Sequence, residues 1–232
     1  MKFENKLISG LLVKRYKRFF VDVKIKNKII TAHCPNTGSM YGLLKAGNKV
    51  WLTKSNNPKR KLKYTLQIIE NNKNKVGINT HLTNNIVLEA IRNKLIPEFN
   101  NVKTIKQEVS FGANTRFDFY LSNNKYKYFL EIKNVTLSRK KTIAEFPDAI
   151  TSRGTKHINE LLKAKKFNYK IYILFVVQRD DCAKFKVADD IDHIYSSLLS
   201  KAINKGLKIL CYDCKFSSKG IKLNKPLKFI SQ

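Results

Sequence analysis

Acidic residues are scarce in this chain of 232 residues, which carries 17 Asp and Glu against 46 Lys and Arg. The formal net charge is +29 and the pI is near 10.0, so the expected partner is a polyanion. Nucleic acid, either DNA or RNA, is favoured because phosphate contacts and counterion release stabilise its complex with a basic surface. Lys outnumbers Arg 38 to 8, which coding bias in an A/T-rich genome would explain. Such bias does not explain the shortage of acids, and the nucleic-acid interpretation therefore stands.

Long apolar runs are also missing. The longest, Ile171–Val177, is far shorter than the roughly 18 residues of a membrane-spanning helix. No basic amphipathic helix is evident, and Met1–Lys6 leads into an alternating strand pattern in place of an apolar signal core. We therefore expect a cytoplasmic protein that does not bind membranes.

Four cysteines are too few for a disulfide framework in a chain of this length. Cys211 and Cys214 have the spacing of half a zinc site, but no second half follows, so reduced thiols are favoured over structural zinc. No Gly-x-Ser-x-Gly or Gly-Lys-Ser/Thr motif is present, which argues against serine-hydrolase and P-loop chemistry. His33 and Cys34 precede a Pro-Asn-Thr-Gly stretch, and a rigid turn is more plausible there than a nucleophile or metal pair.

The first third of the chain is the more densely basic part, and its apolar residues alternate. Residues 1–83 hold 18 basic and 3 acidic residues, against 28 and 14 in residues 84–232. About five short strands separated by turn signals are predicted within the alternating runs 7–26, 29–33, 49–53 and 61–70. Such a series predicts a small closed barrel of the OB type, and we expect it to form a domain over residues 1–83.

Residues 84–232 alternate between helical and strand-like patterns and are expected to form a second domain. Helices are predicted over 83–95, about 155–167 and about 190–205, and strands over about 104–111, 115–121, 126–135, 171–177 and 207–214. This αβββαβαβ order predicts a mixed sheet with helices on its faces, and the whole chain is then of the α+β class.

Three residues within the predicted strands stand out: Asp118, Glu131 and Lys133, which form the pattern D-x12-E-x-K. Two adjacent antiparallel strands joined by a short turn can bring both carboxylates to one edge, and Lys133 shares the strand face of Glu131. Carboxylate oxygens are ligands for Mg²⁺ or Mn²⁺, and a bound metal promotes phosphodiester hydrolysis. The alternative is an exposed strand pair that carries acids by chance.

Eight stretches of the chain have specific residues in a recognisable order, at 12–19, 33–43, 57–66, 76–80, 116–119, 131–137, 146–157 and 177–179. Through these stretches the sequence resembles the sugar fermentation stimulation protein A family over nearly its whole length. The resemblance implies an N-terminal OB-like domain and a C-terminal domain of the PD-(D/E)xK nuclease fold. It also implies non-specific DNA binding, a regulatory role in sugar (maltose) metabolism, and nuclease activity on DNA or RNA.

The resemblance places Asp118, Glu131 and Lys133 on the catalytic signature of that fold, with Phe117 where the signature usually has Pro. Glu89 lies on the preceding helix, where nucleases of this fold often carry another acid, and it is a candidate additional metal ligand. The alternative for Glu89 is a solvated helix residue paired with Arg92 or Asn93.

The candidate nucleic-acid contacts fall into three groups. Basic residues interleave with aromatic residues in the predicted barrel at Lys14, Arg15, Lys17, Arg18, Lys59, Arg60 and Lys61. A polar loop before a helix, for which Thr155 is a plausible cap, offers Arg153, Lys156 and His157 to a phosphate. Gln178 follows the apolar strand, at the carboxyl edge where polar functional residues of α/β sheets usually lie. Solvated lysines, an ordinary cap and a plain strand exit are the alternatives.

Three function classes compete. The first is a metal-dependent nuclease, in which the barrel binds the nucleic-acid backbone and the second domain cleaves it. The second is a non-catalytic DNA-binding regulator, and an RNA-associated accessory protein acting through its charge alone is a weaker third. The sequence carries no signature of a particular oligomeric state.

Overall fold

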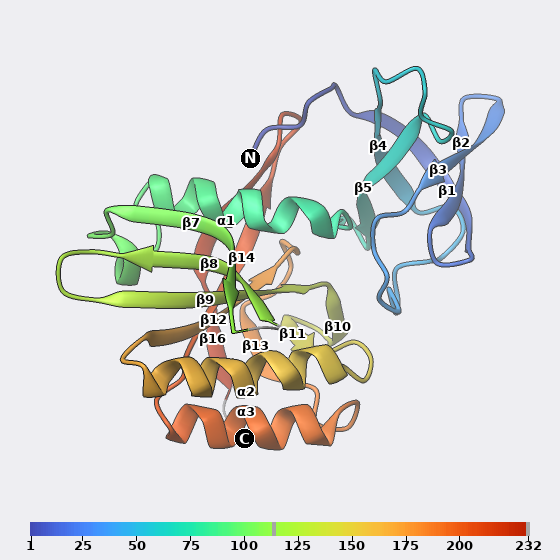
Figure 1. The fold of residues 1–232 in the computed structure, drawn as a ribbon. Coiled ribbons are helices and arrows are strands. Elements are labelled where there is room, and N and C mark those ends of the chain that lie inside the picture. The colour runs from blue at the N-terminus through green and yellow to red at the C-terminus, as the bar shows by residue number, and fades with distance from the viewer. Residues whose placement is uncertain (113–114, 231–232) are drawn as a thin grey trace.

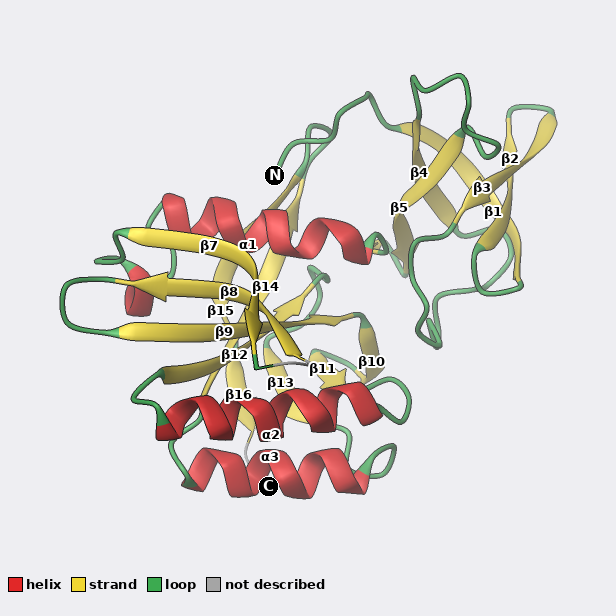
Figure 2. Ribbon diagram, in the orientation of Figure 1, coloured by secondary structure: helices red, strands yellow, loops and turns green. Residues whose placement is uncertain are grey.

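The computed structural model describes residues 1–112 and 115–230, which form a β-barrel followed by a larger unit built on a mixed sheet (Figures 1 and 2). The barrel strands follow the order β3-β2-β1-β4-β5-β6, and a parallel pairing of β3 with β5 closes the barrel. The strands are β1 (Ile8–Tyr16), β2 (Phe20–Ile25), β3 (Lys28–His33), β4 (Lys49–Lys54), β5 (Tyr64–Asn71) and β6 (Asn74–Gly77). The predicted OB-type barrel is confirmed.

Alternation builds the barrel, since every second side chain of a strand points into it. Val21 and Val23 of β2, and Leu52 of β4, are fully buried in its core. The run 7–26 is two strands joined by a tight turn. Lys17 and Arg18 both have positive φ (45° and 59°) in this turn, which no Gly, Asn or Pro marks in the sequence.

The second unit contains a six-stranded mixed sheet in the order β15-β14-β12-β9-β8-β7 and a smaller sheet in the order β10-β11-β13-β16. Its strands are β7 (Thr104–Phe111), β8 (Thr115–Ser122), β9 (Lys127–Val135), β10 (Leu137–Lys140), β11 (Ile143–Phe146), β12 (Lys170–Val177), β13 (Lys184–Val187), β14 (Lys208–Phe216), β15 (Ile221–Pro226) and β16 (Lys228–Ile230). The predicted mixed sheet is present, and the small sheet is an addition that the sequence patterns did not indicate.

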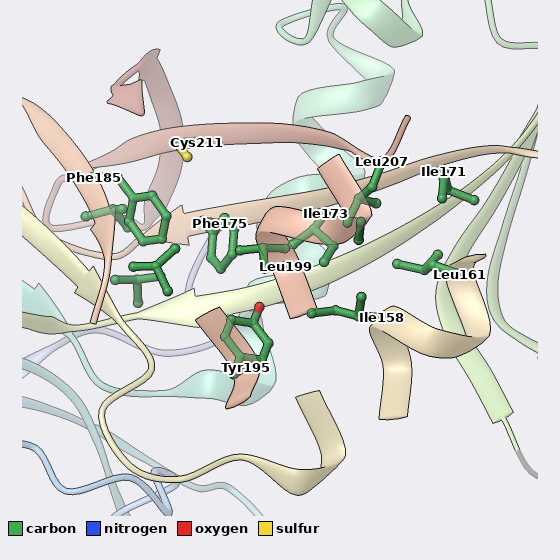
Figure 3. Close-up of a cluster of buried hydrophobic side chains, with 14 of the residues drawn as sticks. Ile158, Leu161, Ile171, Ile173, Phe175, Phe185, Tyr195, Leu199, Leu207 and Cys211 are labelled. Atoms are coloured by element: carbon green, nitrogen blue, oxygen red, sulfur yellow. The ribbon is translucent and has the colours of Figure 1, made fainter. Parts of the chain in front are cut away.

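Helices cover both faces of the large sheet (Figure 1). Helix α1 (Thr83–Arg92) lies on one face, while α2 (Ser152–Lys166) and α3 (His193–Asn204) pack side by side on the other. The cluster on the α2 and α3 side includes Phe175, Leu199 and Tyr195 (Figure 3). The central strand β12 is buried on both faces, which explains why its sequence is a continuous apolar run.

The helices begin and end a few residues from the predicted positions. Helix α1 ends at Arg92, and no side chain caps its first turn, which follows Leu82. Helix α2 begins at Ser152 because Thr151, and not Thr155, accepts a hydrogen bond from the Gly154 N–H. Asp192 caps α3 in the same way, through the Tyr195 N–H.

Several contacts join the barrel to the larger unit. The Gly77 N–H of β6 donates to the Gln178 carbonyl (2.8 Å), and the Ser39 N–H of a barrel loop donates to Asp148 Oδ2 (2.9 Å). The N-terminal amine of Met1 pairs with Glu89 of α1 (2.6 Å), so the chain starts on the larger unit before it crosses to the barrel. No helix within the described ranges is long and apolar enough to span a membrane.

The four cysteines are buried and free. Cys211 belongs to the core on the α2 and α3 side, and Cys214 to the core on the α1 side. The two thiols therefore lie on opposite faces of the sheet and cannot ligate one zinc ion together.

Candidate active site

The candidate site lies where β8 and β9 separate. Their antiparallel ladder ends at the pair Phe119–Leu130, and Asp118 and Glu131 would be the next pair in the same register. Beyond this point β9 continues to pair with β12, while β8 stays with β7. The two carboxylates thus occupy the two arms of a fork, called here the fork.

The side-chain alternation of β8 is interrupted at Asp118, so that residues before and after it face opposite sides of the sheet. Phe117 packs in the core on the α2 side and Phe119 in the core on the α1 side, although residues two apart normally face the same way. Across the ladder, Glu108 of β7 has a positive φ of 52°, and it forms no ladder pair with Asp118. Such backbone in a residue other than glycine costs about 1 kcal/mol or more and concentrates at functional sites.

Two donors hold the Asp118 carboxylate. Its Oδ2 accepts a hydrogen bond from the backbone N–H of Ile132 (2.7 Å), which ties the two arms of the fork together. Its Oδ1 accepts one from the Asn84 side chain (3.0 Å), and the same amide lies 3.3 Å from Glu108 Oε1. Helix α1 therefore helps to orient this carboxylate through Asn84.

Two basic groups engage one oxygen of Glu131. Lys133 Nζ lies 2.8 Å from Oε1, and His157 Nδ1 of α2 forms a short hydrogen bond to the same atom. The other oxygen, Oε2, is buried and has no partner within the described chain. Only 3% of Glu131 is exposed. A buried, unpaired carboxylate oxygen is costly unless a ligand satisfies it.

The pKa values of the two carboxyls are shifted in opposite directions. Burial and the neighbouring charge of Glu131 raise the pKa of Asp118 to about 6. Burial alone would raise the pKa of Glu131 as well, but Lys133 and His157 hold it below its usual range. The fork therefore carries one firmly ionised carboxylate and one that repels it, an arrangement that a cation would relieve.

A polar cavity of about 450 Å³ opens beside Asp118. Its lining includes Arg153, Lys156 and His157 of α2, together with Arg116 of β8. Arg153 and Lys156 are exposed, whereas His157 is 7% exposed. Four cationic or histidine side chains thus line the cavity beside the carboxylates of Asp118 and Glu108, which suits an anionic substrate.

The residues present fit a divalent cation. Oε2 of Glu131 and the carboxylate of Asp118 supply hard oxygen ligands, and small cations such as Mg²⁺ complete their shell with water and substrate phosphate. No three His, Cys, Asp or Glu side chains form a metal cluster anywhere in residues 1–112 and 115–230. The Glu89 carboxylate pairs with the Met1 amine (2.6 Å) and forms no cluster with the two fork carboxylates among the described residues; its role as a metal ligand stays a prediction.

Three of the predicted nucleic-acid contacts make hydrogen bonds within the chain. Gln178 is fully buried and donates to Thr83 Oγ1 (3.0 Å), so its prediction as a nucleic-acid contact is wrong. Arg15 donates to the backbone carbonyls of Arg18, Asn36 and Gly38. Arg60 binds Thr65 Oγ1 (2.8 Å) beside the barrel. The other barrel candidates, Lys14, Lys17, Arg18, Lys59 and Lys61, are exposed.

Asn84, Glu108 and Arg116 belong to the fork's surroundings but were not singled out from the sequence. Asn84 and Glu108 lie 34 and 10 residues before Asp118, outside the D-x12-E-x-K pattern. The position of Arg116, two residues before Asp118 on one strand, was the one available signal for it.

Comparison with known proteins places the chain in a family. A family model described as "Sugar fermentation stimulation protein RE domain" matches residues 81–220, and one described as "SfsA N-terminal OB domain" matches residues 13–78. The chain belongs to the sugar fermentation stimulation protein family. Relatives described as sugar fermentation stimulation protein homologs include one from Pelagibacter ubique, 52% identical over 231 residues and 100% of both chains. Homologs from Maricaulis maris (41%, 98% of both chains) and Bartonella henselae (43%, 95% of both chains) are also similar.

A solved member of the family has the same fold. The Pyrococcus furiosus SfsA structure, described as a complex with Ca²⁺, matches with a TM-score of 0.89 at 27% identity. The match covers 99% of this chain and 98% of that protein. The barrel and the mixed sheet are therefore arranged alike in this chain and in that family member.

Proposed function

We propose that this member of the sugar fermentation stimulation protein family is a metal-dependent nuclease that hydrolyses phosphodiester bonds of DNA or RNA. The observation that carries the proposal is the position of Asp118 and Glu131 just beyond the last pair of the β8–β9 ladder, with one oxygen of Glu131 buried and unpaired. The net charge of +29 supports a nucleic-acid substrate. The Ca²⁺ complex of the Pyrococcus furiosus protein is consistent with a cation site in the family.

Each residue of the fork has a distinct task in this reaction. Asp118 and Glu131 would hold the cation, Mg²⁺ or Mn²⁺, which when bound supplies charge neutralisation and a more acidic water. Lys133 keeps Glu131 ionised through its 2.8 Å contact and places a positive charge beside the reacting phosphate. His157 fixes the orientation of Glu131, and Arg153 and Arg116 attract the nucleic-acid backbone to the cavity.

The test is a cleavage assay with single- and double-stranded DNA and RNA, with Mg²⁺ or Mn²⁺ and with chelator. We expect Asp118→Ala, Glu131→Ala and Lys133→Ala each to lose cleavage by about 100-fold or more while they retain binding, because each removes charge stabilisation at the reacting phosphate. Lys127→Ala, on the same strand but at its far, exposed end, is the matched control and should cleave like the wild type. If all four variants cleaved as fast as the wild type, the activity would belong to a contaminant, and the proposal would be refuted.

The second candidate is a non-catalytic DNA-binding regulator of sugar metabolism genes. The burial of Glu131 and the engagement of its Oε1 by both Lys133 and His157 favour it, because these contacts also stabilise a fork that holds no metal. The name of the homologs agrees with such a role. This candidate predicts salt-sensitive DNA binding with no cleavage under any divalent cation, and the same assay distinguishes it from the first.

A further inference from the structure

A second cavity, of about 290 Å³, lies between the barrel, the first four residues of the chain and the start of α1. It shares no lining residue with the cavity of the fork. Its volume is close to the ~300 Å³ at which small-molecule sites begin. It is called here the interdomain cavity.

The floor of the interdomain cavity is a chain of buried polar side chains. Leu66 of β5 points into the barrel core, so Thr65 and Gln67 on either side of it point outward. Gln67 is nevertheless only 5% exposed, and it donates to Thr53 Oγ1 (2.8 Å) and accepts from the Asn79 amide (3.0 Å). A satisfied polar network beneath a cavity is suited to orient a polar ligand.

One wall of the cavity is cationic and has unused hydrogen-bonding capacity. Of the Arg60 guanidinium, only Nη2 has partners within the described chain, namely Thr65 Oγ1 and His33 Nδ1 (3.5 Å). The ring of His81 makes no hydrogen bond to any described residue. Burial, Arg60 and His81 together lower the pKa of His33. The Nε and Nη1 groups of Arg60 are therefore available to an anion, which would also offset the repulsion on this wall.

The start of α1 adds to the positive potential. Leu82 precedes its first turn without a side-chain cap, and this turn contains no acidic residue. Leu82 and Asn85 both line the cavity. The 3-10 turn Thr80–Leu82 runs directly into α1, and the Thr83 N–H donates to the Thr80 carbonyl. The helix dipole, and not a set of free N–H groups, therefore favours a negatively charged ligand at this end. The acidic residue of the lining is Glu4, near the N-terminus.

We propose that the interdomain cavity binds a nucleoside monophosphate. Arg60 and His33 hold its phosphate near the positive end of α1, and the amides of Gln67, Asn79 and Asn85 contact the sugar or base. This site goes beyond the proposed nuclease function, since it uses no residue of the fork and its occupation does not require cleavage.

Histidine NMR signals can test the site, because the chain has four histidines in distinct places. His33 and His81 line the interdomain cavity, His157 contacts Glu131 in the fork, and His193 lies exposed on α3. His33→Gln and His81→Gln each remove one ring signal and so assign it. The probes are adenosine 5′-monophosphate, adenosine and inorganic phosphate, added separately to the full chain without divalent cation.

We expect adenosine 5′-monophosphate to shift the His33 and His81 signals to saturation while the His193 signal stays in place. Its affinity should exceed that of adenosine and of phosphate by about tenfold or more, because it uses both parts of the cavity. Arg60→Met should weaken its binding by a similar factor, whereas Lys61→Met, an exposed neighbour, should not. Circular dichroism of both variants checks that the barrel is folded.

Three results would overturn the proposal: unmoved His33 and His81 signals, equal binding of adenosine and its monophosphate, or equal binding by the Arg60→Met and Lys61→Met variants. A separate titration with Mg²⁺ reports on the fork through His157. Loss of the His157 response with retained nucleotide binding would count against the nuclease and leave the interdomain cavity intact.

Discussion

Replacing Asp118 by Asn should stabilise the metal-free protein at pH 8 and remove its response to divalent cations. Burial and the charge of Glu131 raise the pKa of Asp118 from 3.8 to about 6, so ionising this carboxyl costs more in the folded than in the unfolded chain. At 1.36 kcal/mol per pH unit this difference is about 3 kcal/mol, and about 2 kcal/mol after allowing for solvent screening at the part-exposed side chain.

The sign of the effect follows from proton linkage. A carboxyl whose pKa is raised by folding favours the folded state at low pH, and that contribution is lost as pH rises from about 4 through about 6. The amide introduced by Asp118→Asn keeps one acceptor for the Ile132 N–H but removes the charged partner of Asn84, at a cost of about 1 kcal/mol. Asp118→Asn should therefore be slightly destabilising at pH 4 and stabilising by about 1 kcal/mol at pH 8.

Urea unfolding followed by circular dichroism, with chelator present, measures this change. Circular dichroism is preferred to fluorescence because the one tryptophan, Trp51, lies on β4 of the barrel and not near the fork. A pH-independent difference between the two proteins would refute the reasoning, and so would a destabilisation of more than about 1 kcal/mol at pH 8. Addition of Mg²⁺ should raise the stability of the wild type and leave the variant unchanged.

Three further outcomes follow from the structure. Lys133→Met should destabilise the protein by about 3 kcal/mol in thermal or urea unfolding, because it leaves the buried Glu131 charge with His157 as its remaining partner; a loss below about 0.5 kcal/mol would contradict this account. Gly77→Ala should cost about 1–3 kcal/mol, since its Cβ would collide with the fully buried Gln178 side chain. Gly38→Ala should cost less, because its closest contact is the carboxylate end of the half-buried Asp148 side chain, with Asn36 Oδ1 next at 3.1 Å. DNA affinity should fall steeply with salt. Removal of the two basic residues Arg153 and Lys156 should reduce the slope of log K against log salt by about 2. An unchanged slope would show that the DNA does not bind at this cavity.

Local patterns predicted much of the fold. The short strand-like runs within residues 7–70, such as the alternating run of β1, predicted strands with one buried face, and the closed barrel follows from several such strands in sequence. The apolar run at 171–177 became the doubly buried β12 for the same reason. The small sheet was missed because its four strands are short, at most four residues each, and come from separate parts of the chain.

Turns and helix ends were predicted less well. Lys17 and Arg18 form the hairpin turn with positive φ at both positions. Turns of this kind usually contain Gly or Asn, so the sequence did not predict this conformation. Thr151 and Thr155 are equally good caps by residue type. Thr151 is the cap because its backbone is non-helical (φ −127°, ψ 81°), so that its side chain can accept from the Gly154 N–H.

Spacing along the chain was enough to predict that Asp118 and Glu131 lie close together, because the register of two joined antiparallel strands follows from that spacing; the ladder ends one pair before them. The groups that surround the two carboxylates could be known from the folded structure alone. His157 reaches Glu131 from α2, Asn84 reaches Asp118 from α1, and Glu89 pairs with the chain's own amine. These contacts join segments far apart in sequence, and they depend on how helices pack across a sheet, which no local spacing encodes.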